Sequence, residues 1–134
     1  MTLRRAYAAI ALLAVGGMLA SKPTLAADKW EELGCQKVGF LIDRDVVKVG
    51  RREGRFKAIR LDVSGNAVYM EDLKVVYGNG APDDIPVRSE IRDGGQTRAL
   101  DLKGRDRVID RVEMVYRAKP NFKGSAKVCV FGLS

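Results

Sequence analysis

The stretch FKAIRLDV, residues 56–63, decides the fold class. Its aliphatic residues occupy every second position from Ile59 to Val63, and charged residues lie between them. Successive side chains on a β-strand point to opposite faces, so this period of two predicts a strand with one buried face and one exposed face. The turn-forming residues 64–66, Ser-Gly-Asn, follow at once. The stretch therefore indicates a strand that covers a hydrophobic core.

Short runs of similar character recur on both sides of this stretch. They span residues 45–49, 68–70, 73–77, 85–87, 98–102, 108–117 and 126–131. Glycine, asparagine and aspartate separate them, and no part of the chain after residue 34 shows sustained helical periodicity. The sequence therefore predicts an all-β protein: a single-domain, antiparallel, jelly-roll-like β-sandwich of about seven to eight strands.

The start of the chain has the pattern of a cleavable signal peptide. Arg4-Arg5 precedes an uncharged apolar run over residues 6–20, and Thr-Leu-Ala at 24–26 suits a signal peptidase. An uncleaved membrane anchor is the alternative, but the apolar run is shorter than the about 20 residues that span a bilayer. We therefore expect a signal peptide over residues 1–26 and one domain over 27–134, located in the periplasm or secreted, without a transmembrane segment.

Removal of the signal peptide changes the charge balance. The whole chain carries a net charge of +7, and residues 1–26 contain three basic residues and no acid, so the mature chain carries +4. This modest charge, together with the expected export and the lack of interleaved aromatic residues, argues against nucleic acid as a partner.

The two cysteines, Cys35 and Cys129, lie near the two ends of the mature chain. In an exported protein they are expected to form one disulfide, although two free thiols are the alternative. Such a bridge requires Cα atoms within about 7 Å of each other. The pairing therefore predicts that the first and last strands are neighbours.

Several longer motifs resemble a known family. They are GRFKAIRL at 54–61, DLKVVYGNG at 72–80, DIPVR at 84–88, LKGR at 102–105 and VEMVYR at 112–117. Together they resemble a family of small exported proteobacterial proteins built around a β-rich domain of unknown function, over about residues 30–132. The resemblance implies a compact β-sandwich in the cell envelope, and it supplies no activity, ligand or catalytic residue.

The residue inventory argues against an enzyme. The chain contains no histidine, which excludes the Ser-His-Asp and Cys-His arrangements of nucleophilic catalysis. A carboxylate-dependent glycoside hydrolase is the remaining alternative, because it needs only two acids in a cleft. The acids here mostly alternate with lysine or arginine, as on the exposed face of a strand. We therefore expect no catalytic residues and no cofactor, with calcium as the one exception considered below.

Arginine is the stronger indication of function. Two turn regions are rich in it, and they contribute Arg51, Arg52, Arg55, Arg105 and Arg107. The guanidinium group binds carboxylates and phosphates through two parallel hydrogen bonds. These residues are candidates for binding an anionic envelope polymer or a lipid head group, provided that they share one face. The alternative is that arginines and acids pair on the protein surface, which contributes little to stability.

The loop after Tyr77 suggests a second kind of site. Asn79, Asp83 and Asp84 offer side-chain oxygens, which calcium prefers. A calcium or carbohydrate site on the rim of the sandwich is therefore an alternative function. Two carboxylates are few for a calcium site, and the single tryptophan, Trp30, is expected ahead of the first strand. A turn that uses these polar groups internally explains the loop equally well.

Overall fold

A computed structural model describes residues 29–121 and 123–134. The expected signal peptide lies outside the described residues. In the described part the chain forms strands joined by turns, with one short 3-10 helix. That part contains no helix of the length and hydrophobicity needed to cross a membrane.

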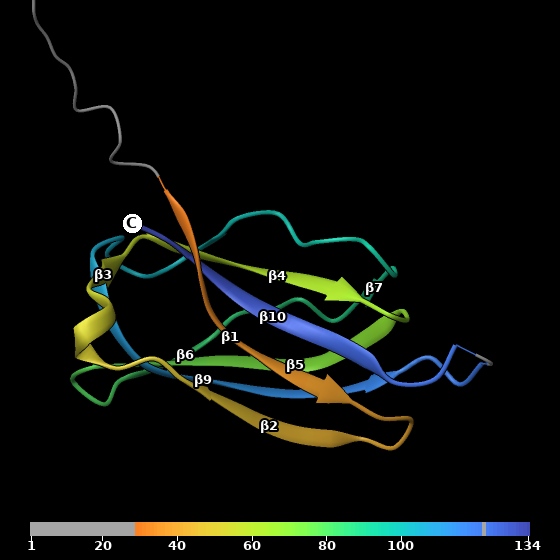
Figure 1. Cartoon of the computed structure of the whole chain (residues 1–134). Coiled ribbons are helices and arrows are strands. Elements are labelled where there is room, and N and C mark those ends of the chain that lie inside the picture. The colour runs from red at the N-terminus through yellow and green to blue at the C-terminus, as the bar shows by residue number, and fades with distance from the viewer. Residues whose placement is uncertain (1–28, 122) are drawn as a thin grey trace, which may run out of the picture.

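The strands form two antiparallel sheets that pack face to face (Figure 1). Their bounds are β1 (Trp30–Val38), β2 (Asp43–Lys48), β3 (Arg55–Phe56), β4 (Ala58–Ser64), β5 (Val68–Tyr77), β6 (Pro82–Asp84), β7 (Glu90–Ile91), β8 (Leu100–Asp101), β9 (Arg107–Ala118) and β10 (Ala126–Leu133), with the 3-10 helix η4 at Arg51–Glu53. The first sheet has the order β1-β10-β4-β8. The second has the order β2-β9-β5-β6, with β3 on β9 and β7 on β5.

The pairing follows the jelly-roll scheme. If the two-residue strand β3 is set aside and β6 and β7 count as one broken edge strand on β5, the ten strands reduce to eight. The first of these pairs with the last, the second with the seventh, the third with the sixth and the fourth with the fifth. This is a long hairpin rolled into two sheets. The jelly-roll-like sandwich predicted from the sequence is therefore confirmed.

The core lies between the sheets and follows from the alternation seen in the sequence. The inward residues of β4, namely Ile59, Leu61 and Val63, are buried, whereas Arg60 and Asp62 lie on the outer face. On the other sheet, alternate residues of β9 are buried in the same way over the second half of the strand. Each fully buried aliphatic or aromatic side chain contributes about 1.5–3 kcal/mol relative to exposure. The core is thus the main stabilising element of the domain.

The structure differs from the sequence prediction at several places: the predicted strand at 98–102 shortens to Leu100–Asp101, and a short strand that was not predicted forms at Glu90–Ile91. Trp30 begins β1 and does not precede the first strand. Residues 85–87 are not a strand, because the chain pairs with β5 earlier, at Pro82–Asp84. Val108 does not share the buried face of β9, because the pairing with β5 is irregular between Arg111 and Ile109 and this bulge reverses the alternation.

The two cysteines are joined, as predicted. Cys35 of β1 lies directly opposite Cys129 of β10, and a disulfide connects them across the two strands. Their Cα atoms are 4.0 Å apart and their sequence separation is 94. The bridge therefore closes almost the whole domain into one covalent loop. Disulfides persist in oxidising compartments, which agrees with the expected export.

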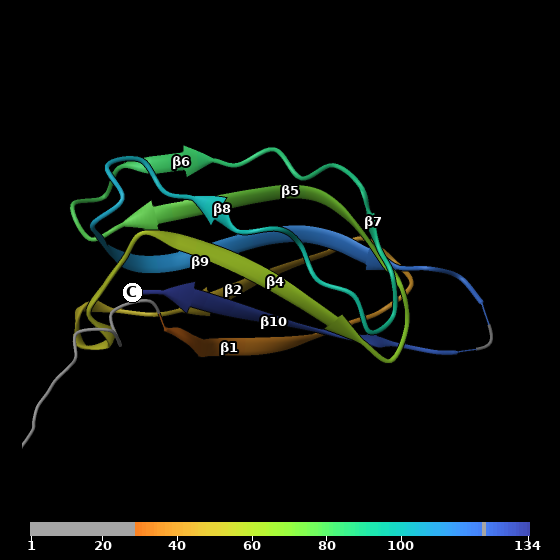
Figure 2. The ribbon, with the colours of Figure 1, turned by 90° about the horizontal axis from the view of Figure 1, so that it is seen from above.

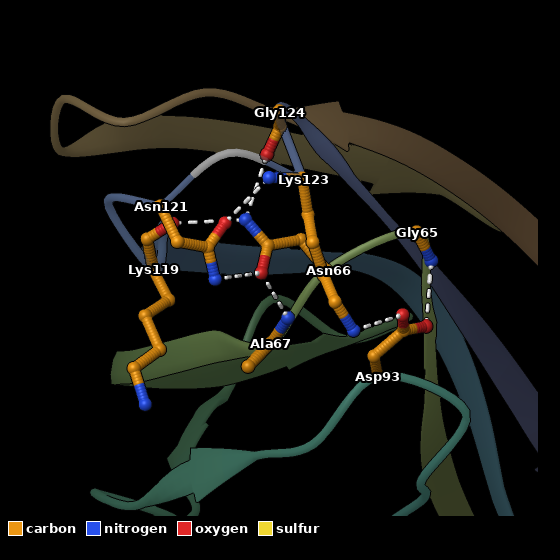
Figure 3. A network of polar contacts seen from close by, with 8 residues as sticks. All are labelled: Gly65, Asn66, Ala67, Asp93, Lys119, Asn121, Lys123 and Gly124. Atoms are coloured by element: carbon orange, nitrogen blue, oxygen red, sulfur yellow. Dashed lines mark hydrogen bonds and ion pairs between the residues drawn. The ribbon is translucent and has the colours of Figure 1, made fainter.

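A buried asparagine holds two loops together at one end of the sandwich (Figure 3). Asn66 is fully buried, and its Nδ2 donates to the carbonyl oxygens of Lys119 (2.8 Å) and Gly124 (2.7 Å). Its Oδ1 accepts from the Ala67 N–H (2.7 Å) and from Asn121 Nδ2 (3.1 Å). The side chain thus uses both donors and both acceptor positions inside the protein. It fastens the β4–β5 turn to the β9–β10 loop.

Candidate functional site

The predicted arginine residues meet at the opposite end of the sandwich. η4 and β3, the β5–β6 turn and the β8–β9 turn lie together at this end in both ribbon views (Figures 1 and 2). The register between β3 and β9 explains this, because Phe56 is paired with Arg107 and Arg55 with Val108. Two arginine-rich segments far apart in sequence are therefore held side by side by backbone hydrogen bonds.

These segments line an open hollow of about 730 Å³, called here the arginine hollow. Its lining residues are Arg51, Gly54, Arg55, Tyr77, Gly78, Asn79, Arg107 and Val108. Every charged side chain in this lining is an arginine. Arg52 and Arg105 lie exposed in the same two segments but do not line the hollow. The structure thus brings together Arg51, Arg55 and Arg107, three of the five predicted residues.

Arg107 is held in a defined orientation. Its guanidinium carbon lies 3.7 Å from the centre of the Tyr77 ring, and its Nη1 donates to the Lys103 carbonyl oxygen at 3.0 Å. A guanidinium stacked on an aromatic ring gains from the charge of the cation over the ring face. Only one of the five guanidinium N–H groups is used by the Lys103 carbonyl, so the remaining donors are available to a ligand.

Tyr77 is in turn fixed by the buried carboxylate of Asp83. The Tyr77 hydroxyl donates to Asp83 Oδ2 and accepts from the Lys103 backbone N–H at 3.1 Å. Asp83 is only 4% exposed, and its other oxygen lies 3.7 Å from Lys103 Nζ. Burial, reinforced by the Asp83 carboxylate, raises the pKa of Tyr77 to about 12. The tyrosine therefore stays neutral and provides a stable ring for Arg107.

The other arginines of this end differ in how far their donors are used. Arg55 Nη1 donates to the Asp106 carbonyl oxygen at 3.2 Å and lies 3.9 Å from the exposed Asp106 carboxylate. The side chains of Arg51, Arg52 and Arg105 make no hydrogen bond or ion pair to any other residue between 29 and 121 or between 123 and 134. The unused donors of Arg51 and Arg107, in a lining that includes no carboxylate, form an arrangement suited to an anion.

Arg60 shows the contrasting arrangement on the outer face of the first sheet. It lies between the rings of Trp30 and Phe131, at 4.6 and 4.7 Å from their centres. Its Nε and Nη2 donate to the two carboxylate oxygens of Asp62, at 2.7 and 3.2 Å. The charge of Arg60 is thus paired with Asp62, and its guanidinium contacts two rings of the same protein. Arg60 is therefore structural, whereas the arginines of the hollow retain unused donors.

The family of the chain follows from its sequence. The model of a family described as a domain of unknown function, DUF2541, matches residues 8–132. The chain belongs to this family. The membership confirms the resemblance seen in the motifs, and it assigns no activity to the DUF2541 domain.

Comparisons with individual proteins add little to the family. A search of the curated proteins found no significant match to this DUF2541 domain. Among solved structures it is similar to AlgX of Pseudomonas aeruginosa, a protein characterized both structurally and functionally, with a TM-score of 0.48 and 13% sequence identity. The match covers 90% of this chain and 35% of that protein, so the chain spans about a third of its length.

The DUF2541 domain does not gather the three predicted calcium ligands into one shell. Asp83 faces inward to Tyr77, whereas Asp84, the next residue of β6, is exposed on the other face. Asn79 Oδ1 accepts the Ala81 N–H at 3.0 Å within the turn. Gly80 adopts a positive φ of 87°, as the Gly-Asn-Gly sequence suggests. The oxygens of Asn79 and Asp83 thus serve the turn and the tyrosine, and those of Asp84 point to solvent.

One group of potential metal ligands is present elsewhere in the described part of the chain. The ligand atoms of Glu32, Cys35 and Cys129 lie within 4.8 Å of one another. Both sulfur atoms are joined in the disulfide. A disulfide sulfur is not a thiolate, so this group lacks the donors that a metal would use.

The sequence does not indicate the supporting residues of the hollow. Tyr77 ends the predicted strand at 73–77 and is buried, but one face of its ring lies against Arg107. The sequence suggests Asp83 as a calcium ligand, whereas the carboxylate hydrogen-bonds the tyrosine. Pro82-Asp83-Asp84 is typical of a turn, so its formation of an edge strand with Asp83 directed inward has no sequence signal.

Proposed function

We propose that this domain is a non-catalytic module of the cell envelope that binds an anionic polymer at the arginine hollow. The observation that carries the proposal is the lining, in which Arg51, Arg55 and Arg107 are the charged residues and no carboxylate takes part. A carboxylated or phosphorylated chain has the charge and the paired oxygens that arginine recognises.

The shape and support of the hollow favour a repeating chain over a small buried ligand. The three arginines come from a 3-10 turn, a short strand and the start of β9, and the first two are exposed. Tyr77 fixes only Arg107, so one guanidinium is preorganised while the others can follow the spacing of charges on a ligand. Binding of this kind weakens with added salt, because each contact is a screened charge interaction.

The proposal is tested with two defined polymers, polygalacturonate for carboxylates and polyphosphate for phosphates. Binding of the mature protein is measured by calorimetry at low and physiological salt. We expect the double variant Arg51→Gln/Arg107→Gln to weaken binding at least tenfold, because each lost charge-assisted contact contributes about 1.5–3 kcal/mol. Arg107→Lys should fall between this variant and the unmodified protein, because lysine keeps the charge and loses the planar fork.

Arg88→Gln/Arg92→Gln is the matched control, because it removes the same number of charges. Arg88 and Arg92 are exposed and lie outside the arginine hollow. If this variant weakens binding as much as Arg51→Gln/Arg107→Gln does, the polymer responds to net charge and the proposed site is wrong. Absence of binding to either polymer by the unmodified protein would also refute the proposal.

A further inference from the structure

The β1–β2 loop exposes three consecutive large apolar side chains. Phe40 is 46% exposed, Leu41 82% and Ile42 58%. The other exposed large apolar residues of the described chain, Val46 and Tyr69, stand singly on strands. Isolated exposed apolar residues are ordinary on protein surfaces, but a consecutive run of three at a loop tip is not, and such runs mark interaction sites.

The loop is held so that these side chains project away from the core. Gly39 N–H donates to Asp43 Oδ2 at 2.9 Å, which closes the base of the loop. The Gly39 carbonyl oxygen accepts the Ala118 N–H at 2.8 Å, which ties the same base to the end of β9. The apolar tip is therefore presented by a fastened loop at the end of the sandwich opposite the arginine hollow (Figure 1).

Basic residues flank this tip on both outer faces of the sandwich. Lys37 of β1 lies directly opposite Lys127 of β10 on the outer face of the first sheet, and Arg44 lies on the outer face of the second. Within residues 29–121 and 123–134, no ion pair involves any of these three side chains.

The acids nearest the tip are already engaged, whereas Asp72, farther along β5, shares a surface hollow with Arg44. Asp43 caps Gly39, and Asp45 accepts the hydroxyl of Tyr116 at 2.9 Å. Two further acids lie beside basic residues of their own, in the pairs Glu71–Arg117 at 4.0 Å and Glu90–Lys119 at 3.7 Å. The charge left over beside the apolar tip, at Lys37 and Lys127, is therefore positive.

We propose that this loop docks the protein on an anionic phospholipid surface. Even at the about 3.3 Å per residue of an extended strand, Arg44 and Lys37 lie at most about 10–13 Å behind Leu41, so their extended side chains would reach the head groups when the tip enters the acyl region. Interfacial anchors bury their apolar side by about 5–10 Å, which matches a tip of this size. The acyl chains of the lipid accept the apolar tip, and its negatively charged head groups bind the basic residues beside it.

A second copy of the chain fits this surface less well. In a twofold dimer the same patch faces itself, so the lysines and Arg44 around one tip would face those of the partner. Like charges brought together at an interface oppose association. A phospholipid surface removes this conflict.

The experiment measures sedimentation of the mature protein with vesicles of phosphatidylglycerol and phosphatidylcholine in equal amounts, compared with phosphatidylcholine alone. We expect binding to the anionic vesicles, lost at least tenfold in Leu41→Ser/Ile42→Ser because both side chains leave the apolar phase. Lys37→Gln/Lys127→Gln should lose about fivefold or more, and the loss should disappear on neutral vesicles.

Two controls separate this proposal from the alternatives. Val46→Ser removes an exposed apolar residue outside the loop and should keep full binding. Arg51→Gln/Arg107→Gln tests the arginine hollow, so loss of vesicle binding in that variant alone would overturn docking through the tip while leaving the proposed function standing. Docking through the tip is also wrong if the unmodified protein ignores anionic vesicles. A dimer in light scattering that Leu41→Ser/Ile42→Ser dissolves would assign the tip to a second copy.

Discussion

The two ends of the sandwich use polar side chains in opposite ways. At one end Asn66 is buried, and both donors and both acceptor positions of its side chain form hydrogen bonds. The partners are Ala67, Lys119, Asn121 and Gly124. At the other end Arg51 and Arg107 surround a hollow with most of their donors unused. Polar groups of comparable hydrogen-bonding capacity are thus saturated at one end and left open at the other.

This difference separates stability from binding. A saturated buried group adds to the free energy of unfolding, because its removal leaves its partners without hydrogen bonds. An unsaturated exposed cation adds little to stability and keeps its capacity for a ligand. Variants at the Asn66 end should therefore change unfolding, and variants at the arginine end should change binding.

The largest loss of stability is expected from removal of the disulfide between the first and last strands. Cys35→Ser/Cys129→Ser opens a covalent loop with a sequence separation of 94, which corresponds to about 4–5 kcal/mol of unfolding free energy in the chain-entropy model. Denaturant unfolding of the oxidised protein and of this variant measures the loss. If the two curves coincide, the bridge does not restrict the unfolded chain and the packing of the two sheets alone stabilises the domain.

Asn66→Ala should follow with a loss of about 3 kcal/mol, because one buried N–H and two part-buried carbonyl oxygens lose their hydrogen-bond partner. Asn121→Ala is the control, since Asn121 is exposed and gives only one hydrogen bond to Asn66. It should lose about 1 kcal/mol or less. Equal losses in thermal melts of the two variants would show that Asn66 is not the central member of the network.

Alkaline pH should lower the free energy of unfolding through two buried tyrosines, Tyr77 and Tyr116. Burial, with the Asp83 hydrogen bond next, raises the pKa of Tyr77 to about 12, and burial, with the Asp45 hydrogen bond next, raises the pKa of Tyr116 as well. The unfolded chain releases these protons near pH 10, so this contribution is complete below that pH and, for Tyr77, is lost between about pH 10 and 12. Tyr77→Phe should lessen the decline in unfolding free energy measured from pH 9 to 12. An identical decline in that variant would contradict the role of Tyr77.

The arginine end should show a small effect on stability. Arg51→Gln removes an exposed side chain that has no ion pair in the described residues, so we expect a change within about 0.5 kcal/mol. Denaturant unfolding measures it beside the polymer-binding assay. A loss of stability as large as that of Asn66→Ala would remove the contrast between the two ends.

Calcium should have the smallest effect. The carboxylates of Asp83 and Asp84 lie on opposite faces of β6, and the Asn79 oxygen is used within its turn. We therefore expect the melting temperature to be the same with millimolar calcium as with a chelator. An increase that Asp84→Asn abolishes would return the loop to the calcium function considered from the sequence.

Most of the long strands could be predicted from the sequence, because their alternation of apolar and polar residues extends over many positions. Residues 58–63 and 112–117 alternate over enough positions to show which face is buried. The two-residue strands β3 and β7 are too short for any period to appear, and of the predicted run 98–102 only β8 forms. Their pairing depends on neighbours that only the folded chain supplies, and for the same reason no local pattern indicates the bulge next to Arg111.

The candidate site likewise has a part that the sequence indicates and a part that only the strand pairing produces. The arginine clusters are visible as composition, and the two-residue pairing of β3 with β9 is what joins them. The inward direction of Asp83 depends on its place opposite Val75 in β5, which no local pattern indicates. Three of the arginines named from the sequence therefore line the hollow, whereas the sequence did not indicate Tyr77 and Asp83 as the residues that orient Arg107.

The bridge between the first and last strands also decides how the domain carries mechanical load. Trp30 is paired with Leu133 beyond the disulfide, and Cys35 is paired with Cys129 at it. Tension applied to the two ends of the domain's chain would peel β1 from β10, and the last residues of β10 from β4, only as far as this covalent link. The segment between Cys35 and Cys129 is closed by the link, which carries the pull past it. A domain anchored at one end of its chain and pulled at the other would thus keep the apolar tip, which lies inside this segment, in place.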